Sequence, residues 1–212
     1  MSVRAEKFTG WYNVAVVFSA FWFRTFMPVR YHNIEKAQLD APYILICNHK
    51  SNLDPLIAGW KCSRYQIRYL GKKELTKFAL LRALFKGMRM IPVDRHHSDI
   101  GAVRACLKTL KEGHVLGVFP EGTRHKRGTM QKEDMESGVA MIALRANVPL
   151  LPVYISGKPR LFRTTDCYYG DPFTVSDIAE RGVNKEACEE TMERIAALYR
   201  DMVKTHEKTK RP

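Results

Sequence analysis

The sequence is short of apolar runs that could cross a membrane as a helix. The apolar and aromatic stretch WYNVAVVFSAFWF, at residues 11–23, falls short of the roughly 20 residues that a bilayer-spanning helix needs. No small-residue cleavage site follows it, which argues against a secretory signal peptide. Basic side chains flank it at Arg4, Lys7, Arg24 and Arg30. We therefore expect residues 1–30 to form an interfacial or re-entrant membrane anchor, with a buried helix of the core as the alternative.

The sequence also lacks the cysteine and histidine spacing of a metal site or a disulfide framework. Its five cysteines are odd in number and are not paired at metal-ligand distances along the chain. We expect them to stay reduced in a cytosolic setting, with Cys47 and Cys106 in the apolar core. Neither a metal ion nor a bound cofactor is predicted, because no cluster of His, Cys and carboxylate residues has ligand spacing.

Acidic residues are scarce beside basic ones. The chain has 22 Asp and Glu against 35 Lys and Arg, a formal net charge of +13, and a pI near 9.6. Such a chain favours an anionic partner: nucleic acid, anionic lipid or a phosphorylated substrate. A nucleic-acid-binding module is one hypothesis, but the aromatic residues gather at the amino terminus and no recognition motif is present. We expect an anionic membrane surface as the partner and no nucleic acid.

Much of the basic charge lies in residues 61–95, where ten Lys and Arg face only Glu74 and Asp94. Leucine, phenylalanine and methionine are interleaved with the cations. A basic, apolar-rich amphipathic segment is typical of a helix lying on an anionic membrane. A plain solvated face is the alternative.

No internal repeat or low-complexity run interrupts the 212 residues, which are 45% hydrophobic and suffice for one α/β domain. Short apolar runs predict strands at residues 43–47, 67–70, 90–94, 114–119 and 150–155. Helical spacing of apolar residues predicts helices at residues 98–113, 137–146 and 188–202. This alternation indicates a mixed, largely parallel sheet flanked by helices, over residues 31–206, with a basic tail at residues 207–212.

The stretch NHKSNLDPL, residues 48–56, follows the first predicted strand and places His49 five residues before Asp54. On a helix, at about 100° per residue, positions five apart diverge by about 140°, so the side chains can meet only if the chain turns. Asp followed by Pro favours a helix start at residues 54–55, which leaves residues 49–53 as a loop. The alternative is that Asp54 only caps the helix and His49 is an ordinary loop residue.

Two further stretches leave predicted strands and end on an arginine. GMRMIPVDR ends on Arg95, and VFPEGTR carries Glu121, Gly122 and Arg124. Glycine permits close backbone approach, and the planar guanidinium fork suits phosphate. Because the carboxyl ends of parallel strands share one edge, we expect these residues and His49 to form one concave, cationic site. Such a site suits an acceptor that carries a phosphate and a hydroxyl.

Taken together, the motifs resemble those of the 1-acyl-sn-glycerol-3-phosphate acyltransferases, glycerolipid acyltransferases with a His-four-Asp motif. The matching runs are NHKSNLD, IPVDR, FPEGTR and VPLLPV, in the family's order over about residues 40–160. The resemblance implies the glycerolipid acyltransferase fold, with His49 as catalytic base and Asp54 as its orienting partner. It further implies that the glycerol phosphate is bound by Arg95, Glu121, Gly122 and Arg124. We expect His96 and Lys126, which lie beside the matched arginines, to supplement this site. Residues 135–138 read MESG, where family members often carry an aromatic-lysine-x-glycine stretch.

The activity that the resemblance implies is transfer of a fatty acyl group from acyl carrier protein or coenzyme A to lysophosphatidic acid, giving phosphatidic acid. A neutral imidazole would take the proton of the sn-2 hydroxyl as that oxygen attacks the thioester carbonyl, so no acyl-enzyme is needed. Glycerol 3-phosphate or another lysophospholipid is the alternative acceptor. The expected location is the cytoplasmic face of the membrane, by monotopic association.

Overall fold

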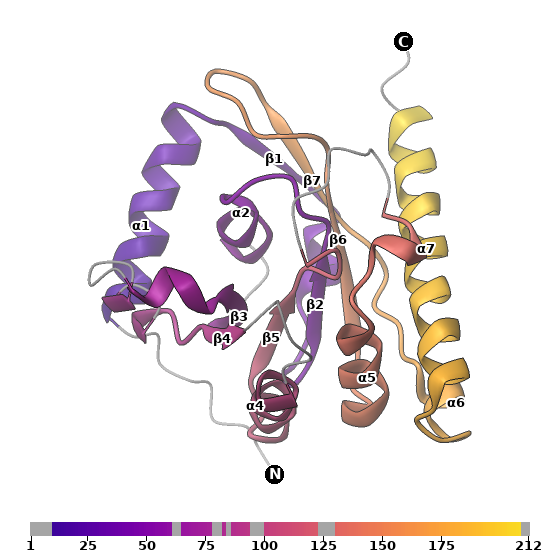
Figure 1. Ribbon diagram of the computed structural model, residues 1–212. Helices are drawn as coiled ribbons and strands as arrows, with labels where there is room; N and C mark the ends of the chain where they lie inside the picture. Colours follow the sequence, from indigo (N-terminus) through magenta and orange to yellow (C-terminus); the bar gives the residue numbers. More distant parts are fainter. Residues whose placement is uncertain are drawn as a thin grey trace.

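The computed structural model describes residues 10–60, 65–77, 82–83, 86–93, 100–122 and 130–208 (Figure 1). Its α-helices are α1 Gly10–Thr25, α2 Asp54–Trp60, α4 Ile100–Lys111, α5 Ser137–Ala146, α6 Ser176–Ala179 and α7 Lys185–Lys208. Its strands are β1 Val29–His32, β2 Ile44–Cys47, β3 Ile67–Lys72, β4 Ile91–Val93, β5 Val115–Val118, β6 Leu150–Ile155 and β7 Thr165–Tyr169. Short 3₁₀ helices are η1 Ile34–Ala37, η2 Lys73–Lys77 and η3 Lys132–Asp134.

Within the described ranges the strands form one seven-stranded sheet in the order β1-β7-β6-β2-β5-β3-β4. From β6 to β4 every neighbouring pair is parallel. β7 pairs antiparallel with β6 and parallel with β1, so these two strands run against the other five. The sheet is therefore mixed and largely parallel, flanked by helices, as the sequence predicts.

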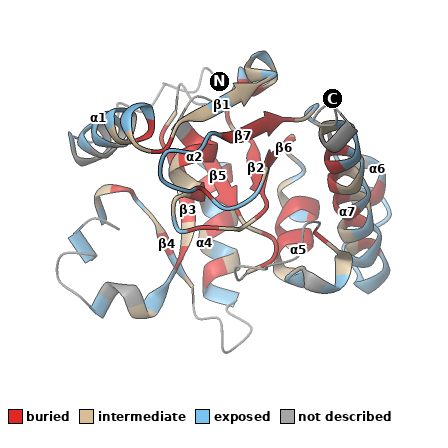
Figure 2. Cartoon of the chain, turned by 90° about the horizontal axis from the view of Figure 1, so that it is seen from above, coloured by how far each residue is buried: buried red, intermediate tan, exposed pale blue. Residues whose placement is uncertain are grey.

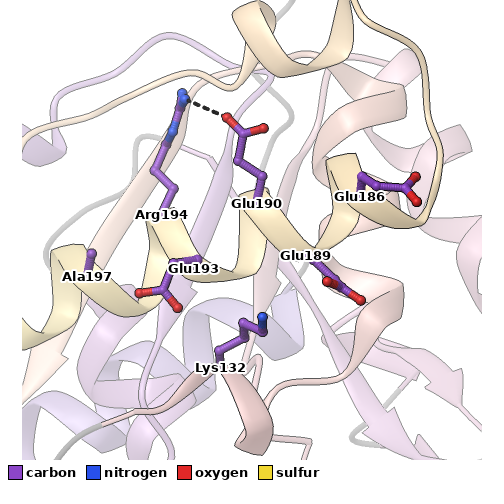
Figure 3. A pocket seen from close by; sticks show the side chains of 7 residues that line it. All are labelled: Lys132, Glu186, Glu189, Glu190, Glu193, Arg194 and Ala197. Atoms are coloured by element: carbon purple, nitrogen blue, oxygen red, sulfur yellow. Dashed lines mark ion pairs between the residues drawn. The ribbon is translucent and has the colours of Figure 1, made fainter.

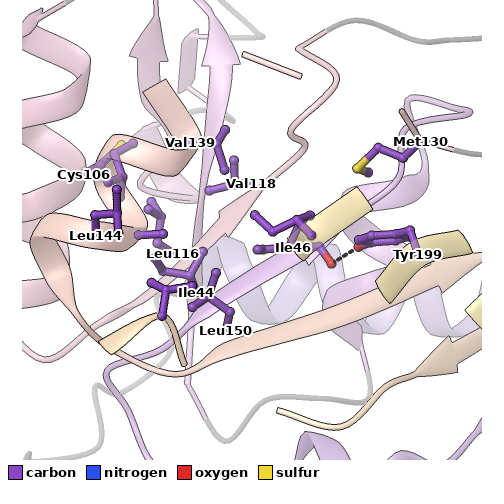
Figure 4. Packing of buried hydrophobic residues seen from close by; sticks show 14 of the residues in the cluster. Ile44, Ile46, Cys106, Leu116, Val118, Met130, Val139, Leu144, Leu150 and Tyr199 are labelled. Carbon is purple, nitrogen blue, oxygen red and sulfur yellow. Dashed lines mark hydrogen bonds between the residues drawn. The ribbon is translucent and has the colours of Figure 1, made fainter. Parts of the chain in front are cut away.

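Helices cover both faces of the sheet, with α1 and α2 on one side and α4, α5 and α7 on the other (Figure 1). β2 shows why its sequence is apolar throughout. Ile44 and Ile46 join the cluster under α4, α5 and α7 (Figure 4), whereas Leu45 and Cys47 join the cluster under α1 and α2. Since side chains alternate along a strand, a strand buried on both faces has no polar positions. Figure 2, which looks down on the sheet edge, shows such buried strands between the helix layers.

The predicted elements are largely confirmed. β2 and β6 lie where the apolar runs place them, and α5 ends at Asn147, whose left-handed φ of 46° closes the helix. Cys47 and Cys106 are fully buried, in agreement with their predicted place in the core. The sequence did not predict β1 and β7, whose residues include charged and polar side chains.

Two predicted boundaries fall inside structural elements. β1 begins at Val29, so the limit at residue 30 between anchor and domain lies within a strand that pairs with β7. α7 continues to Lys208, into the predicted basic tail. The basic segment at residues 61–95 does not form one amphipathic helix, because its described part contains β3, η2 and β4. Residues 61–64, 78–81, 84–85 and 94–95 of the segment lie outside the described residues.

Helix α1 is attached to the domain at its carboxyl end. Phe23 is 4% exposed and, with Met27, belongs to the cluster beneath α2. Val17 and Phe21, in contrast, are more than 60% exposed. In the part of the chain that the structure describes, no helix is both long and apolar enough to cross a membrane.

Candidate active site

The site is built where three adjacent strands end. β2 lies between β5 and β6 and is parallel to both, so Cys47, Val118 and Ile155 end their strands at one edge. The loops that follow carry His49 and Glu121. The carboxyl edge of a parallel sheet is the usual place for a binding site in α/β proteins, and this one gathers two of the predicted motifs.

Asn48 fixes the start of the loop that carries His49. Its side-chain amide donates to the carbonyl of Ile155 at 3.0 Å, and its Oδ1 accepts the Ile155 N–H at 2.8 Å. The side chain thus continues the ladder between β2 and β6 by one step, and it is 2% exposed. Buried polar groups that are fully bonded define one conformation, so the residue after Asn48 leaves the sheet at a fixed position.

His49 and Asp54 meet, as the sequence predicts. The Nδ1 atom of His49 lies 3.0 Å from Oδ2 of Asp54, and that carboxylate is 0% exposed. The same Oδ2 accepts the backbone N–H groups of Lys50 and Ser51, both at 2.6 Å. The five-residue spacing is explained by this turn, which wraps the backbone around one carboxylate before α2 begins. Asp54 is therefore more than a helix cap.

The geometry defines what the imidazole can do. A carboxylate accepts hydrogen bonds, so the facing Nδ1 carries the hydrogen and Nε2 keeps its lone pair as a proton acceptor. The His49 ring lies 4.5 Å from the ring of Phe119, which stacks in turn on Tyr69. With its side chain 13% exposed, His49 is held by aromatic packing on one side and by Asp54 on the other. The arrangement suits a general base at the sheet edge.

Glu121, predicted from the resemblance to bind the glycerol phosphate, supports the histidine loop. Its Oε2 accepts the backbone N–H of His49 at 2.7 Å, and the residue is 3% exposed. A buried carboxylate repels a phosphate at close range, so this contact points to a structural use of the side chain. The sequence shows where the strands end, but it does not show which of the following loops form hydrogen bonds with one another.

Gly122 forms the tight turn after β5, with φ of 60°. A Cβ at this position would stand 2.7 Å from Oε1 of Glu136. The backbone N–H of Glu136 also donates to the carbonyl of Pro120 at 2.8 Å. The MESG stretch, at the start of α5, therefore packs directly against the FPEG turn, a contact that sequence analysis does not reveal.

Tyr199 of α7 contacts strands β2 and β6 from the face of the sheet that α4, α5 and α7 cover. Its hydroxyl lies 2.5 Å from the carbonyl oxygen of Ile46 and 2.9 Å from that of Val153 (Figure 4). Burial is the main cause that raises the pKa of Tyr199 well above its ordinary value of 10.0. The apolar residues of α7 pack in the core, and the Tyr199 hydroxyl among them connects β2 to β6.

Comparison with known proteins identifies the family of this chain. The acyltransferase family model matches residues 28–156, more than half of the chain, and includes both the histidine loop and the FPEG turn. The chain belongs to the acyltransferase family.

Curated relatives of this acyltransferase chain include two bacterial proteins named 1-acyl-sn-glycerol-3-phosphate acyltransferase. The one from Bacillus subtilis is 31% identical over 129 residues, which cover 61% of this chain and 63% of the relative. The one from Streptococcus pneumoniae is 28% identical over 176 residues, 80% of this chain and 64% of the relative. The chain thus spans less than two thirds of the length of these relatives.

Among solved structures, the 1-acyl-sn-glycerophosphate acyltransferase PlsC from Thermotoga maritima has the same fold. The two share 23% sequence identity with a TM-score of 0.66, and the match covers 91% of this chain and 76% of that one. The mixed sheet flanked by helices is therefore the fold of this neighbour.

Four predicted site residues lie outside the described residues of the acyltransferase chain: Arg95, His96, Arg124 and Lys126. The structure thus brings together His49, Asp54, Glu121 and Gly122, and the phosphate-binding cations stay a prediction. In the described part of the chain, no group of three or more His, Cys, Asp or Glu side chains is placed to hold a metal ion.

A surface hollow of about 550 Å³ lies away from the site, between η3 and the first half of α7 (Figure 3). Four glutamates of α7 line it, at positions 186, 189, 190 and 193, together with Lys132, Arg194 and Ala197. Arg194 is engaged by Asp177 in a two-bond ion pair, which lowers the pKa of that carboxyl to about 2. An acid-lined hollow repels a phosphorylated acceptor, so it does not compete with the sheet edge as the candidate site.

Proposed function

We propose that the chain transfers a fatty acyl group from an acyl carrier protein or coenzyme A thioester to the sn-2 hydroxyl of 1-acylglycerol 3-phosphate, giving phosphatidic acid. The observation that carries the proposal is the buried Asp54 carboxylate 3.0 Å from Nδ1 of His49, at the edge of the sheet. The names of the relatives supply the acceptor, a 1-acyl-sn-glycerol-3-phosphate.

The reaction follows from the tautomer that Asp54 imposes. Nε2 of His49 takes the proton of the acceptor hydroxyl as its oxygen attacks the thioester carbonyl carbon. Asp54 stabilises the imidazolium that forms. When the tetrahedral intermediate collapses, the carbon–sulfur bond breaks, the new ester is left, and the thiolate recovers the proton from His49. The substrate supplies the attacking oxygen, so no cysteine is required as a nucleophile.

The cations of the neighbouring loops are assigned to the acceptor phosphate. Arg95 and Arg124, with His96 and Lys126 beside them, follow strands that end at the same edge as β2. Loss of one charge-assisted contact in a partly desolvated site costs about 1.5 to 3 kcal/mol, or roughly a ten- to hundredfold rise in acceptor KM. In this proposal Gly122 lets the backbone approach the phosphate, and Glu121 acts mainly by holding the His49 loop.

One observation supports a second acceptor. The Glu136 carboxylate packs on Gly122, beside the predicted phosphate site, and a negative charge there disfavours a dianionic phosphate monoester. A lysophospholipid with a phosphodiester head group carries less negative charge and tolerates this neighbour better. Glycerol 3-phosphate, the other alternative, is also a dianion and is disfavoured for the same reason.

Product analysis tests these assignments. The protein is assayed with lysophosphatidic acid, glycerol 3-phosphate and zwitterionic lysophospholipids, each with an acyl carrier protein and a coenzyme A donor, and products are identified by mass. His49→Ala serves as the control, because loss of a general base lowers turnover by about a hundred- to ten-thousandfold. Normal turnover by a folded His49→Ala protein would overturn the mechanism. Absence of acylation with every acceptor, together with salt-dependent nucleic-acid binding, would favour the nucleic-acid alternative.

We also propose that α1 anchors the chain monotopically on the cytoplasmic face of an anionic membrane. Its exposed side chains include Val14, Val17, Phe18 and Phe21, which support an interfacial position. Substitution tests this better than deletion, because Phe23 is buried in the domain and its removal would open the core. Val17→Ser with Phe21→Ser is expected to weaken binding to anionic vesicles, and unchanged binding would contradict the anchor.

A further inference from the structure

We propose that the turn between β6 and β7, residues 160–163, is a second membrane-docking element that completes one apolar surface with α1 and seats it on anionic lipid. The inference rests on the membrane association proposed above and extends it to a segment more than 130 residues away in the sequence. We define the docking surface as Val14, Val17, Phe18, Phe21, Leu161 and Phe162, which are 57% to 75% exposed.

The turn presents two large apolar side chains to solvent. The N–H of Arg163 bonds to the carbonyl of Arg160 at 3.3 Å, which leaves Leu161 and Phe162 as the central residues. Phe162 is 75% exposed and has φ of 56°, a region that bulky L-residues seldom adopt. Its N–H donates to the carbonyl of Phe26 at 2.7 Å, so the residue that follows α1 holds the turn in place. A strained backbone that displays an aromatic ring to solvent indicates a functional use of that ring.

Aromatic contacts connect the turn to α1. The rings of Phe26 and Phe162 lie 6.3 Å apart, and Phe26 also contacts Trp22 and Phe21. Figure 1 shows the β6–β7 connection beside the carboxyl end of α1, at the top of the molecule. An exposed apolar area assembled from two distant segments marks an interaction surface rather than scattered surface residues.

The charge around the docking surface identifies the partner. Exposed cations border it at Arg24, Lys158, Arg160 and Arg163, and residues 156–164 contain no acidic side chain. Apolar side chains bordered by Lys and Arg fit the interface of a bilayer that contains anionic lipid. A second copy of this chain fits poorly, because two equally cationic borders would repel each other.

The position of the turn relates docking to the active site. β6 ends at Ile155, whose backbone binds Asn48 next to His49, and the chain then enters the turn. The four glutamates near the start of α7 lie at the opposite end of the molecule (Figures 1 and 3). An anionic membrane therefore attracts the His49 edge and repels the far end, which orients the site toward lipid.

The first test replaces Leu161 and Phe162, the apolar tip of the turn, in the full chain. Leu161→Ser with Phe162→Asn removes both apolar groups, and Asn tolerates the positive φ. Val183→Ser is the matched control, because Val183 is also an exposed apolar residue but lies between α6 and α7. Co-flotation with vesicles of phosphatidylcholine and phosphatidylglycerol should show about ten- to hundredfold weaker binding for the double variant and no change for the control.

The second test removes the charge alone. Arg160→Gln with Arg163→Gln should weaken binding by about fivefold for each arginine when phosphatidylglycerol is present, with no effect on pure phosphatidylcholine. The control is Arg104→Gln with Lys111→Gln, which removes two exposed charges from α4. An equal loss in the α4 control would mean that only net charge matters, and would overturn the assignment of the turn.

A label locates the turn directly. Leu161→Cys carrying an environment-sensitive fluorophore should shift to shorter wavelength on anionic vesicles, whereas Val183→Cys should not. No shift at position 161, or vesicle binding unchanged by loss of the apolar tip, would overturn the proposal. If Leu161→Ser with Phe162→Asn instead turned a dimer of this chain into a monomer and left vesicle binding unchanged, the turn would be a contact between two copies, and the proposal would also be overturned. Flotation needs no turnover, so acyl transfer to a water-soluble short-chain acceptor tests the proposed function independently.

Discussion

One oxygen of Asp54 lies 3.0 Å from Nδ1 of His49 and 2.6 Å from two consecutive backbone nitrogens, those of Lys50 and Ser51. The carboxylate that would orient His49 as the proposed base is thus also the centre of the turn that carries it. Substitution of Asp54 should therefore change both the proposed catalysis and the local structure of the turn.

Replacement of Asp54 should affect activity and stability differently. Asp54→Asn keeps an oxygen for the backbone N–H groups but loses the charge that stabilises the imidazolium, so turnover should fall by about a hundred- to ten-thousandfold. Asp54→Ala also leaves the buried N–H of Ser51 and the partly buried N–H of Lys50 without their acceptor, which should lower the free energy of unfolding by about 1 to 3 kcal/mol. Turnover numbers and urea denaturation separate the effects. Equal activity of Asp54→Asn and the natural chain would contradict the assigned role.

Asn48 should matter for catalysis without touching the substrate. Asn48→Ala removes both bonds to Ile155 and leaves the buried N–H of Ile155 without this acceptor, whereas the carbonyl keeps its bond from the N–H of Gly157. The expected loss is about 1 to 3 kcal/mol in unfolding free energy. Turnover should fall with it while acceptor KM changes little, because His49 loses its fixed starting position. Ser176→Ala breaks an exposed side-chain bond to Asn147 and serves as the control, with an expected change within about 0.5 kcal/mol.

Gly122→Ala should lower the free energy of unfolding for two reasons, the positive φ of this residue and the contact of the added Cβ with Glu136. With φ of 60°, an L-residue there costs about 1 to 2 kcal/mol, and moving Glu136 out of the way adds about 0.5 to 1.5 kcal/mol. Gly182→Ala is a matched control, since its φ is 95° and nothing lies within 4 Å of the added Cβ. In a double-mutant cycle, Glu136→Ala should remove only the second part of the loss. If the losses caused by Gly122→Ala and Glu136→Ala were additive in the double variant, Glu136 would not crowd this turn.

Tyr199→Phe should lower the free energy of unfolding by about 1 to 3 kcal/mol, because two buried carbonyl groups lose their shared donor. Burial raises the pKa of Tyr199 above 10.0, so the folded state binds this proton more tightly than the unfolded state. The stabilisation is complete below pH 10 and is lost as the pH rises above it. The difference between the natural chain and Tyr199→Phe should therefore shrink above pH 10 in denaturation measurements. A constant difference up to pH 11 would contradict this assignment.

The sequence predicts the centre of the fold better than its edge. β2 and β6 are apolar at every position because both of their faces are covered, and such runs can be recognised without a structure. β7 contains Thr165 and Asp166, both buried, and the carboxylate of Asp166 lies 3.0 Å from Nε2 of His32 on β1. This polar partner comes from a strand far away in the sequence, so no local pattern could reveal that β7 is buried.

The same distinction holds within the site. His49 and Asp54 are close in sequence, and their turn follows from Asp-Pro and the helix start. The Glu121 contact with the His49 N–H and the Asn48 bonds to Ile155 join residues 72 and 107 positions apart. Sequence motifs identify the chemical groups at these strand ends, whereas the register of β2 against its neighbours decides which groups brace one another.

The place of β1 has a consequence for synthesis on the ribosome. β1 pairs only with β7 in the described sheet, and its first residue, Val29, aligns with Thr165. α1 and β1 are made before β7, which emerges from the ribosome only after 136 further residues. During this interval β1 has no strand to pair with in the described sheet. The first part of the chain is thus available to a membrane or a chaperone before the sheet is complete.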